Sequence, residues 1–207
     1  MSLFVFSLFY GGMVCIAGVL GNKLVALGPL AVEAGIFAFL MLVVTSSAVA
    51  ELHGETWANR LVRIGFLPLV AAMILIELVL RLPAAVAMDA ARLTAFETIL
   101  GQSFRLMLAG LIAYGLSQTL NVMIFSRLKG GEGGKLLWFR AAVASALSQI
   151  VDTLLFITIS FYGVFPIGSL LIGQMLAKVV LSIVLVPPLI YLVVAIGRKL
   201  DGQPSPA

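Results

Sequence analysis

The sequence predicts an all-α membrane protein in which six transmembrane helices form one bundle. Of its 207 residues, 62% are hydrophobic and 11% are charged, whereas a soluble domain has about 45–50% apolar and about 25% charged residues. The mean hydropathy is +1.17. Six apolar stretches approach or exceed the roughly 20 helical residues that cross a hydrocarbon core of about 30 Å. Together these observations argue against a soluble globular domain.

Residues that disfavour a continuous helix separate the predicted spans. The six spans are residues 3–20, 30–50, 61–80, 104–125, 140–162 and 167–196. The separating residues are Gly28-Pro29, His53-Gly54, Pro83, the glycine-rich residues 130–134 and Pro166. Residues 82–100 are only mildly apolar and carry three charged side chains, so we expect an interfacial or re-entrant segment there. The last span is long enough to tilt, and Pro187-Pro188 are expected to kink it.

Basic residues near the span ends predict that both termini lie in the cytoplasm, because cytoplasmic loops carry an excess of Lys and Arg. In this orientation eight basic residues are cytoplasmic: Arg60, Arg63, Arg127, Lys129, Lys135, Arg140, Arg198 and Lys199. Four lie on the other side: Lys23, Arg81, Arg92 and Arg105. We expect residues 1–200 to form a single transmembrane domain. Residues 201–207 are polar and contain proline, which is typical of a disordered tail.

Two polar stretches interrupt the fourth and fifth spans. Gln118 and Asn121 are three residues apart and share a helix face. In the next span, residues spaced by four, three and four form one continuous stripe, with Thr153 adjacent to it: Ser145, Gln149, Asp152 and Phe156. A carboxylate near the bilayer midplane costs roughly 2.5–3.5 kcal/mol on insertion scales, and such groups mark binding or transport sites. We expect the two stripes to face each other and enclose a pocket.

Lys178 is the expected charge partner of Asp152. It lies about ten residues into the last span, near the depth of Asp152. The alternative is a purely structural role, in which the amides and Ser145 hold helices together and the charges form a structural ion pair. Buried ion pairs rarely stabilise a protein more than apolar substitutes do. We therefore favour a ligand-binding or proton-coupling role for the pair.

Two further charged residues are candidates for a gating or coupling role. Arg105 opens the fourth span, where it would either snorkel to the interface or contact a ligand or gate. Glu51 closes the second span on the predicted cytoplasmic side.

Several function classes have little support. The sequence contains no Walker motif, dinucleotide fingerprint or HExxH motif, so we expect no cofactor and no catalytic residues. His53 is the only histidine and Cys15 the only cysteine, which is poor material for a metal site or an enzyme. The pI is about 9.5, but the basic residues flank apolar spans instead of forming a patch, so we expect no nucleic-acid partner.

The polar residues resemble the motifs of the queuosine precursor transporter family, also called the vitamin uptake transporter family. Members have an Arg that opens a span whose end reads Gln-x-x-(Asp/Asn)-Val-x-x-Phe, then a Ser, an amide and an Asp-Thr pair, and a Lys in the last long span. The matching residues here are Arg105, Gln118, Asn121, Val122, Phe125, Ser145, Gln149, Asp152, Thr153, Phe156 and Lys178. Glu51 to Gly54 fit the Glu-x-x-Gly end of the second span. Many members carry an Asp one turn earlier, where this chain has Ser47.

The resemblance implies a multi-pass protein of the bacterial inner membrane that imports 7-deazaguanine bases. These bases are 7-cyano-7-deazaguanine and 7-aminomethyl-7-deazaguanine, which are precursors of queuosine in tRNA modification. Because no energy-using domain is visible in the sequence, we expect transport to be driven by a gradient or by a partner. The expected partners are a purine-like small molecule and membrane lipids, and a homo-oligomer is an open alternative to a monomer. The main alternative function is the substrate-capture subunit of a multi-component vitamin importer. A membrane enzyme and an assembly subunit are weaker alternatives.

Overall fold

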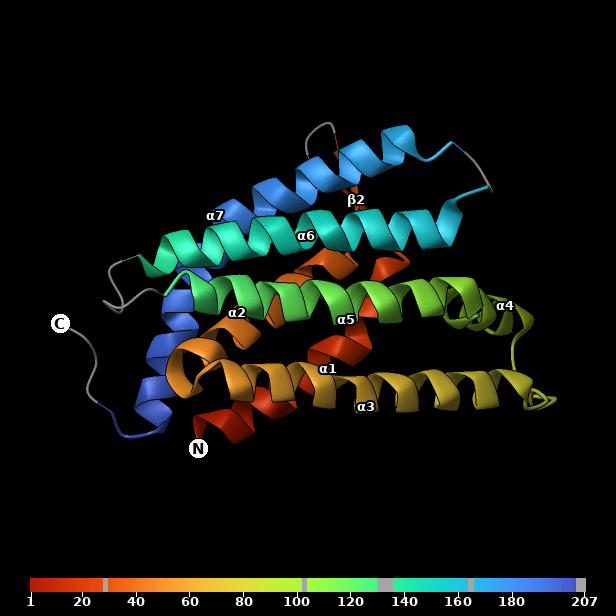
Figure 1. Cartoon of the computed structure of the whole chain (residues 1–207). Helices are drawn as coiled ribbons and strands as arrows, with labels where there is room; N and C mark the ends of the chain where they lie inside the picture. Colours follow the sequence, from red (N-terminus) through yellow and green to blue (C-terminus); the bar gives the residue numbers. More distant parts are fainter. Residues whose placement is uncertain (28–29, 102–103, 130–135, 164–165, 204–207) are drawn as a thin grey trace.

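The computed structural model describes residues 1–27, 30–101, 104–129, 136–163 and 166–203. Six of its helices are long and apolar enough to cross a membrane, which confirms the predicted all-α, six-span architecture (Figure 1). They are α1 (Ser2–Gly21), α2 (Gly35–His53), α3 (Glu55–Arg81), α5 (Phe104–Arg127), α6 (Leu137–Phe161) and α7 (Gly168–Leu200). The predicted spans are therefore placed correctly, and most differ from the helices by only a few residues at each end.

The start of the second span is an exception. Residues 30–33 were expected to be helical, but β1 (Leu24–Leu27) and β2 (Leu30–Glu33) form a short antiparallel hairpin between α1 and α2. Leu24 is paired with Glu33 and Val25 with Val32. The pairing of the two strands provides hydrogen-bond partners for backbone N–H and C=O groups that lie outside the helices. The hairpin packs against α7, and β2 lies beside that helix in Figure 1.

The segment at residues 82–100 contains the short helix α4 (Ala90–Leu100). The side chain of Asp89 caps this helix by accepting a hydrogen bond from the backbone N–H of Arg92. With 11 residues, α4 is only about 16 Å long and is too short to span the bilayer. Most of its residues are exposed, so the segment does not form a seventh span.

Helix α7 is the longest, with 33 residues, and it contains Pro187 and Pro188. A proline inside a helix removes a backbone hydrogen bond and bends the helix. Figure 1 shows α7 changing direction between its first and second halves, as the sequence predicts. The second half of α7 returns the chain toward the start of α1.

Both ends of the described chain lie at one end of the bundle, which we call the terminal end. The Met1 ammonium is 2.7 Å from Asp201 Oδ1, and Ser2 Oγ bonds to His53 Nε2 at 2.8 Å. Hydrogen bonds from Met1 and Ser2 hold the pKa of Asp201 below its usual value. The opposite, distal end holds α4 and the end of α6 (Figure 1). Residues 204–207 of the predicted tail lie outside the described residues.

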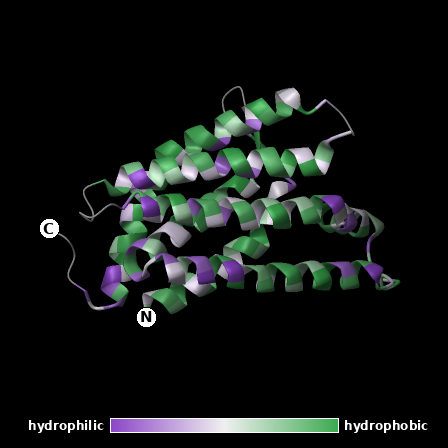
Figure 2. Cartoon of the chain, viewed as in Figure 1, coloured by the Kyte–Doolittle hydropathy of each residue, from purple (hydrophilic) through white to green (hydrophobic). Residues whose placement is uncertain are grey.

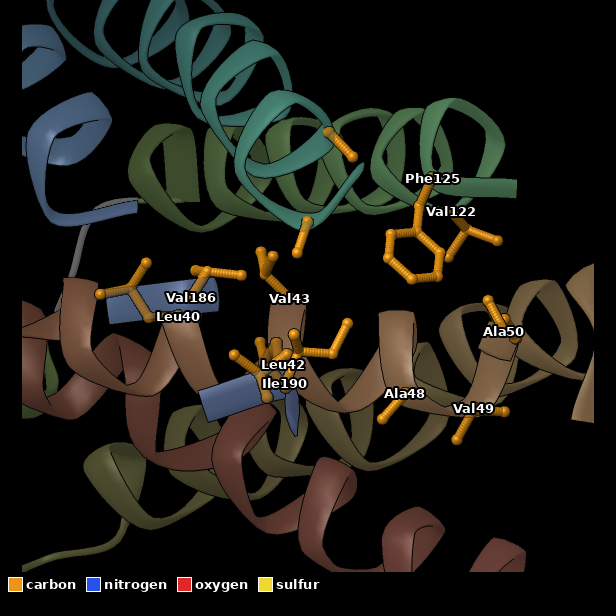
Figure 3. Close-up of a cluster of buried hydrophobic side chains, with 14 of the residues drawn as sticks. Leu40, Leu42, Val43, Ala48, Val49, Ala50, Val122, Phe125, Val186 and Ile190 are labelled. Atoms are coloured by element: carbon orange, nitrogen blue, oxygen red, sulfur yellow. The ribbon is translucent and has the colours of Figure 1, made fainter. Parts of the chain in front are cut away.

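Helix α2 is at the centre of the bundle. Of an apolar stretch of 18 residues in α2, 67% are buried, whereas only 11% are buried in the corresponding stretch of α3. Figure 3 shows α2 side chains such as Leu40 and Val43 between α5 and α7, which contribute Phe125 and Ile190. Figure 2 shows the spans built mainly of hydrophobic residues, with hydrophilic residues gathered mostly toward their ends. This pattern is expected of helices surrounded by lipid.

Candidate functional site

A cavity of about 250 Å³ lies between α1, α2, α3 and α5. It extends from Ile99 and Leu100 of α4 at the distal end to Asp152 of α6 and Lys178 of α7 in the middle of the bundle. Most of its wall is apolar, and Phe39, Tyr114 and Phe156 add aromatic surface. Its volume is just below the roughly 300 Å³ at which pockets for drug-sized ligands begin. The cavity therefore suits a small molecule that contacts apolar and aromatic side chains and a few charged groups.

The predicted ion pair is present where the cavity reaches the middle of the bundle. Lys178 Nζ donates to Asp152 Oδ2 at 3.1 Å, and Ser117 Oγ donates to Asp152 Oδ1 at 3.2 Å. The two charged side chains are only 10% and 7% exposed. Ser117, which the sequence analysis did not single out, is one residue before Gln118 and turns toward α6 instead of α2. Both oxygens of Asp152 are thus satisfied in this state.

Glu33 is a third charged residue on the cavity wall, and the sequence analysis missed it. It ends β2 and lies partly buried beside the cavity. Burial raises the pKa of Glu33, and the charge of Asp152 raises it further, while the ammonium of Lys178 opposes both effects. A sequence signal was available, since Glu33 is a carboxylate near the start of the apolar residues 30–50.

The amides of α5 lie just beyond Asp152 toward the terminal end, and they hydrogen-bond to α2. Gln118 Oε1 accepts a hydrogen bond from Ser46 at 3.3 Å. Asn121 Nδ2 donates to Ser46 Oγ at 3.3 Å and to Ser47 Oγ at 3.0 Å. Gln118 and Asn121 are fully buried and are not among the residues that line the cavity. The stripe of Gln118 and Asn121, which was predicted to face α6, therefore hydrogen-bonds mainly to α2.

Several buried polar atoms near the ion pair have no hydrogen-bond partner within the described part of the chain. Both amide atoms of Gln149 and of Gln174 are in this state, as is Gln118 Nε2. Gln149 is one turn from Asp152, and Gln174 is one turn from Lys178. The hydroxyls of Ser145, Thr153 and Ser182 are also unpaired and buried. An unmade buried hydrogen bond costs about 1–3 kcal/mol, so each of these atoms would gain from a polar partner.

Arg105 has a structural role in this conformation. Its Nε donates to the carbonyl of Ile159, and its Nη2 donates to the carbonyl of Tyr162 at 2.7 Å. These carbonyls lie at the end of α6, where an arginine satisfies free acceptors and complements the helix dipole. Arg105 does not line the cavity.

Glu51 lies away from the cavity in a charged cluster at the terminal end. Its carboxylate is 2.9 Å from Arg140 Nη1 and 3.7 Å from Lys129 Nζ. Arg140 Nε donates to the carbonyl of Phe125 at 3.1 Å, and its guanidinium lies 4.2 Å from the centre of the Phe125 ring. Arg140 is only 2% exposed. The cluster joins the ends of α2, α5 and α6.

The predicted site residues therefore fall into three groups. Asp152, Phe156 and Lys178 line the cavity. Gln118, Asn121, Ser145 and Gln149 form a buried polar layer beyond it toward the terminal end, and Thr153 is buried next to Asp152 on α6. Arg105 lies at the distal end and Glu51 at the terminal end, and neither is among the residues that line the cavity. Among the described residues, no group of three His, Cys, Asp or Glu side chains is placed to hold a metal ion.

Comparisons with known proteins point to a family of transporters. A family model described as "putative vitamin uptake transporter" matches residues 33–193, which is more than half of the chain. The chain is also 32% identical over 141 residues to a protein of Bacillus subtilis (strain 168) named "probable queuosine precursor transporter". The alignment covers 66% of this chain and 61% of the relative. No solved structure matches the chain significantly. Both descriptions are of transporters and not of enzymes.

Proposed function

We propose, from the premise that the chain belongs to the vitamin uptake transporter family, that it imports a 7-deazaguanine queuosine precursor across the bacterial inner membrane. The observation that carries this proposal is the set of buried amides on either side of the Asp152–Lys178 pair that have atoms without a hydrogen-bond partner in the described part of the chain. An apolar cavity with a few convergent polar groups is the usual form of a small-molecule site.

The chemistry of the site suits a guanine-like ring. Such a ring presents a carbonyl acceptor beside several N–H donors, and an amide side chain can both donate and accept. Asp152 lines the cavity and can accept two N–H bonds, and Gln149 and Gln118, in the polar layer next to it, have amide atoms without a hydrogen-bond partner among the described residues. The aromatic side chains of Phe156 and Tyr114 offer faces on which the ring can stack, an interaction worth about 1–3 kcal/mol per base.

In the proposed mechanism the ligand competes with Lys178 for Asp152. The ligand enters the cavity from the distal end and replaces one hydrogen bond of the carboxylate. Lys178 then loses its partner, which links ligand binding to a change in the α6–α7 contact. Release at the terminal end requires the polar layer and the Glu51–Arg140 cluster to separate, because they close the bundle there. No ATP-hydrolysing motif is present in the sequence, so we propose a gradient as the driving force.

The proposed orientation places the terminal end in the cytoplasm. Six spans put both ends of the chain on the same side, and the basic residues favour that side eight to four. Residues 1–200 then form one transmembrane domain, and residues 201–207 a cytoplasmic tail. A reporter enzyme active only in the periplasm, fused after Ala207, is expected to be inactive. The same reporter inserted after Ala87, in the distal connection, is expected to be active, and the reverse result would invert the orientation.

The second candidate function is the substrate-capture subunit of a multi-component importer, which is favoured by the small size of a six-helix chain. Purified protein in liposomes, with a pH gradient and no ATP, separates the two functions. We expect it to accumulate radiolabelled 7-aminomethyl- or 7-cyano-7-deazaguanine unaltered. Binding without accumulation would favour the capture subunit, and no binding of either base would refute the proposed function.

Amide variants in the same assay separate ligand binding from helix packing. Because Gln149 has no hydrogen-bond partner to lose among the described residues, Gln149→Ala is expected to weaken ligand binding about tenfold, with a loss of thermal stability limited to the packing of the removed side chain. Gln118→Ala also loses its bond to Ser46, so a modest loss of stability is expected there. Gln203→Ala is the matched control outside the bundle. A loss of folded protein in Gln149→Ala with unchanged affinity would indicate a packing role.

A further inference from the structure

The charges on the cavity wall do not balance. Glu33, Asp152 and Lys178 are the three charged residues among the described residues that line the cavity. Lys178 forms an ion pair with Asp152, with 3.1 Å between Nζ and Oδ2. No ion pair to Glu33 occurs within the part of the chain that the structure describes. The wall therefore holds two carboxylates and one ammonium, and it carries an excess negative charge when all three are ionised.

The position of Glu33 is fixed by the backbone and not by a charge partner. It pairs with Leu24 in the hairpin, and the next residue, Ala34, donates its backbone N–H to the carbonyl of Lys23 at 2.8 Å. The hairpin packs against α7, the helix that carries Lys178. Burial raises the pKa of Glu33, the ammonium of Lys178 lowers it in part, and Asp152 raises it further, so the ionised form of Glu33 is only partly compensated. A cation placed in the cavity would supply that compensation.

We infer that the cavity prefers ligands that carry a protonated primary amine, and that Glu33 is the residue that binds this amine. The inference rests on the proposed function and adds a specificity to it. The amides and Asp152 bind the polar edge of the ligand's ring, and Glu33 on the hairpin binds the ligand's charged aminomethyl arm. An aliphatic amine remains protonated at neutral pH, because its pKa is near that of lysine, about 10.4. A cyano arm has no proton to donate and would place an acceptor against a carboxylate.

Calorimetric titration of the purified protein with two bases tests this inference. We expect 7-aminomethyl-7-deazaguanine to bind about tenfold or more tightly than 7-cyano-7-deazaguanine, since a charged hydrogen bond distinguishes them. In Glu33→Gln, which keeps the size of the side chain, the affinity for the aminomethyl base is expected to fall by the same factor. The affinity for the cyano base is expected to stay the same or rise. Glu97→Gln, at an exposed position on α4, is the matched control and is expected to change neither affinity.

The possible results separate this inference from the proposed function. Equal affinities of the wild-type protein for the two bases would overturn the inference and leave the proposed function intact. An equal loss of both affinities in Glu33→Gln would also overturn it, and would indicate a proton-carrying or structural role for Glu33. Glu33→Asp keeps the charge and is expected to keep the preference. If neither base binds the wild-type protein, the proposed function itself fails.

Discussion

Replacing Asp152 by asparagine is expected to lower uptake of the 7-deazaguanine base by about ten- to a hundredfold. The change removes the charge that both Lys178 and the proposed ligand require, and hydrogen bonds to charged groups are worth about 1.5–3 kcal/mol. It also leaves Lys178, only 10% exposed on its side chain, without its partner. Breaking a buried pair in this way costs roughly 3–5 kcal/mol, or forces the lysine into its neutral form. Uptake into liposomes and thermal melting in detergent measure the two effects separately.

A double variant separates substrate handling from stability. Asp152→Asn combined with Lys178→Met removes both charges, so the melting temperature is expected to return toward the wild-type value. Uptake is expected to remain low, because the carboxylate that binds the ring edge is still missing. Normal uptake by the double variant would show that Asp152 has no part in substrate binding, and the proposed site would be wrong.

The second large effect is expected at the terminal end, where Glu51→Gln should destabilise the protein by roughly 3–5 kcal/mol. Arg140 is 2% exposed, and Glu51 is the carboxylate that neutralises it at 2.9 Å. Without that carboxylate, the side chain of Arg140 keeps, among the described residues, neutral contacts with the carbonyl and the ring of Phe125. A buried and uncompensated guanidinium is costly because the interior replaces little of its hydration. Thermal or denaturant unfolding in detergent measures the loss.

Glu77→Gln is the matched control for this prediction. Glu77 also pairs with an arginine, Arg81, at 2.7 Å, but the two side chains are 47% and 76% exposed. Exposed pairs contribute about 0.2–1 kcal/mol, so the same substitution is expected to have little effect there. Similar losses in the two variants would mean that burial is not what makes the Glu51–Arg140 contact important.

The sequence by itself determined the membrane class, the six spans and the Asp152–Lys178 pair. Span positions follow from length and hydropathy, because the thickness of the bilayer sets how many apolar residues a helix needs. The pair follows from depth, since a carboxylate and an ammonium near the same level of the membrane are each too costly to remain alone. Helical spacing also showed correctly that Gln118 and Asn121 share a face, as their common contact with Ser46 confirms.

Only the tertiary structure decided which neighbour each polar face meets. Periodicity states which residues share a face, but the rotation of each helix is set by packing against all the others. For this reason the α5 amides bond to Ser46 and Ser47 of α2, and Ser117 makes the link to α6. Arg105 likewise caps α6 and does not reach the cavity.

Glu33 is the clearest example of a contact that helical periodicity does not predict. Its place beside Asp152 and Lys178 depends on strand pairing between residues 24 and 33, and strand pairing is a non-local contact that has no helical period. Hydropathy alone assigned residues 30–33 to a span, because a short apolar strand and the start of a buried helix look alike in sequence. The spans and the central ion pair could thus be predicted from local pattern and depth, whereas the full charge balance of the cavity required the packed hairpin.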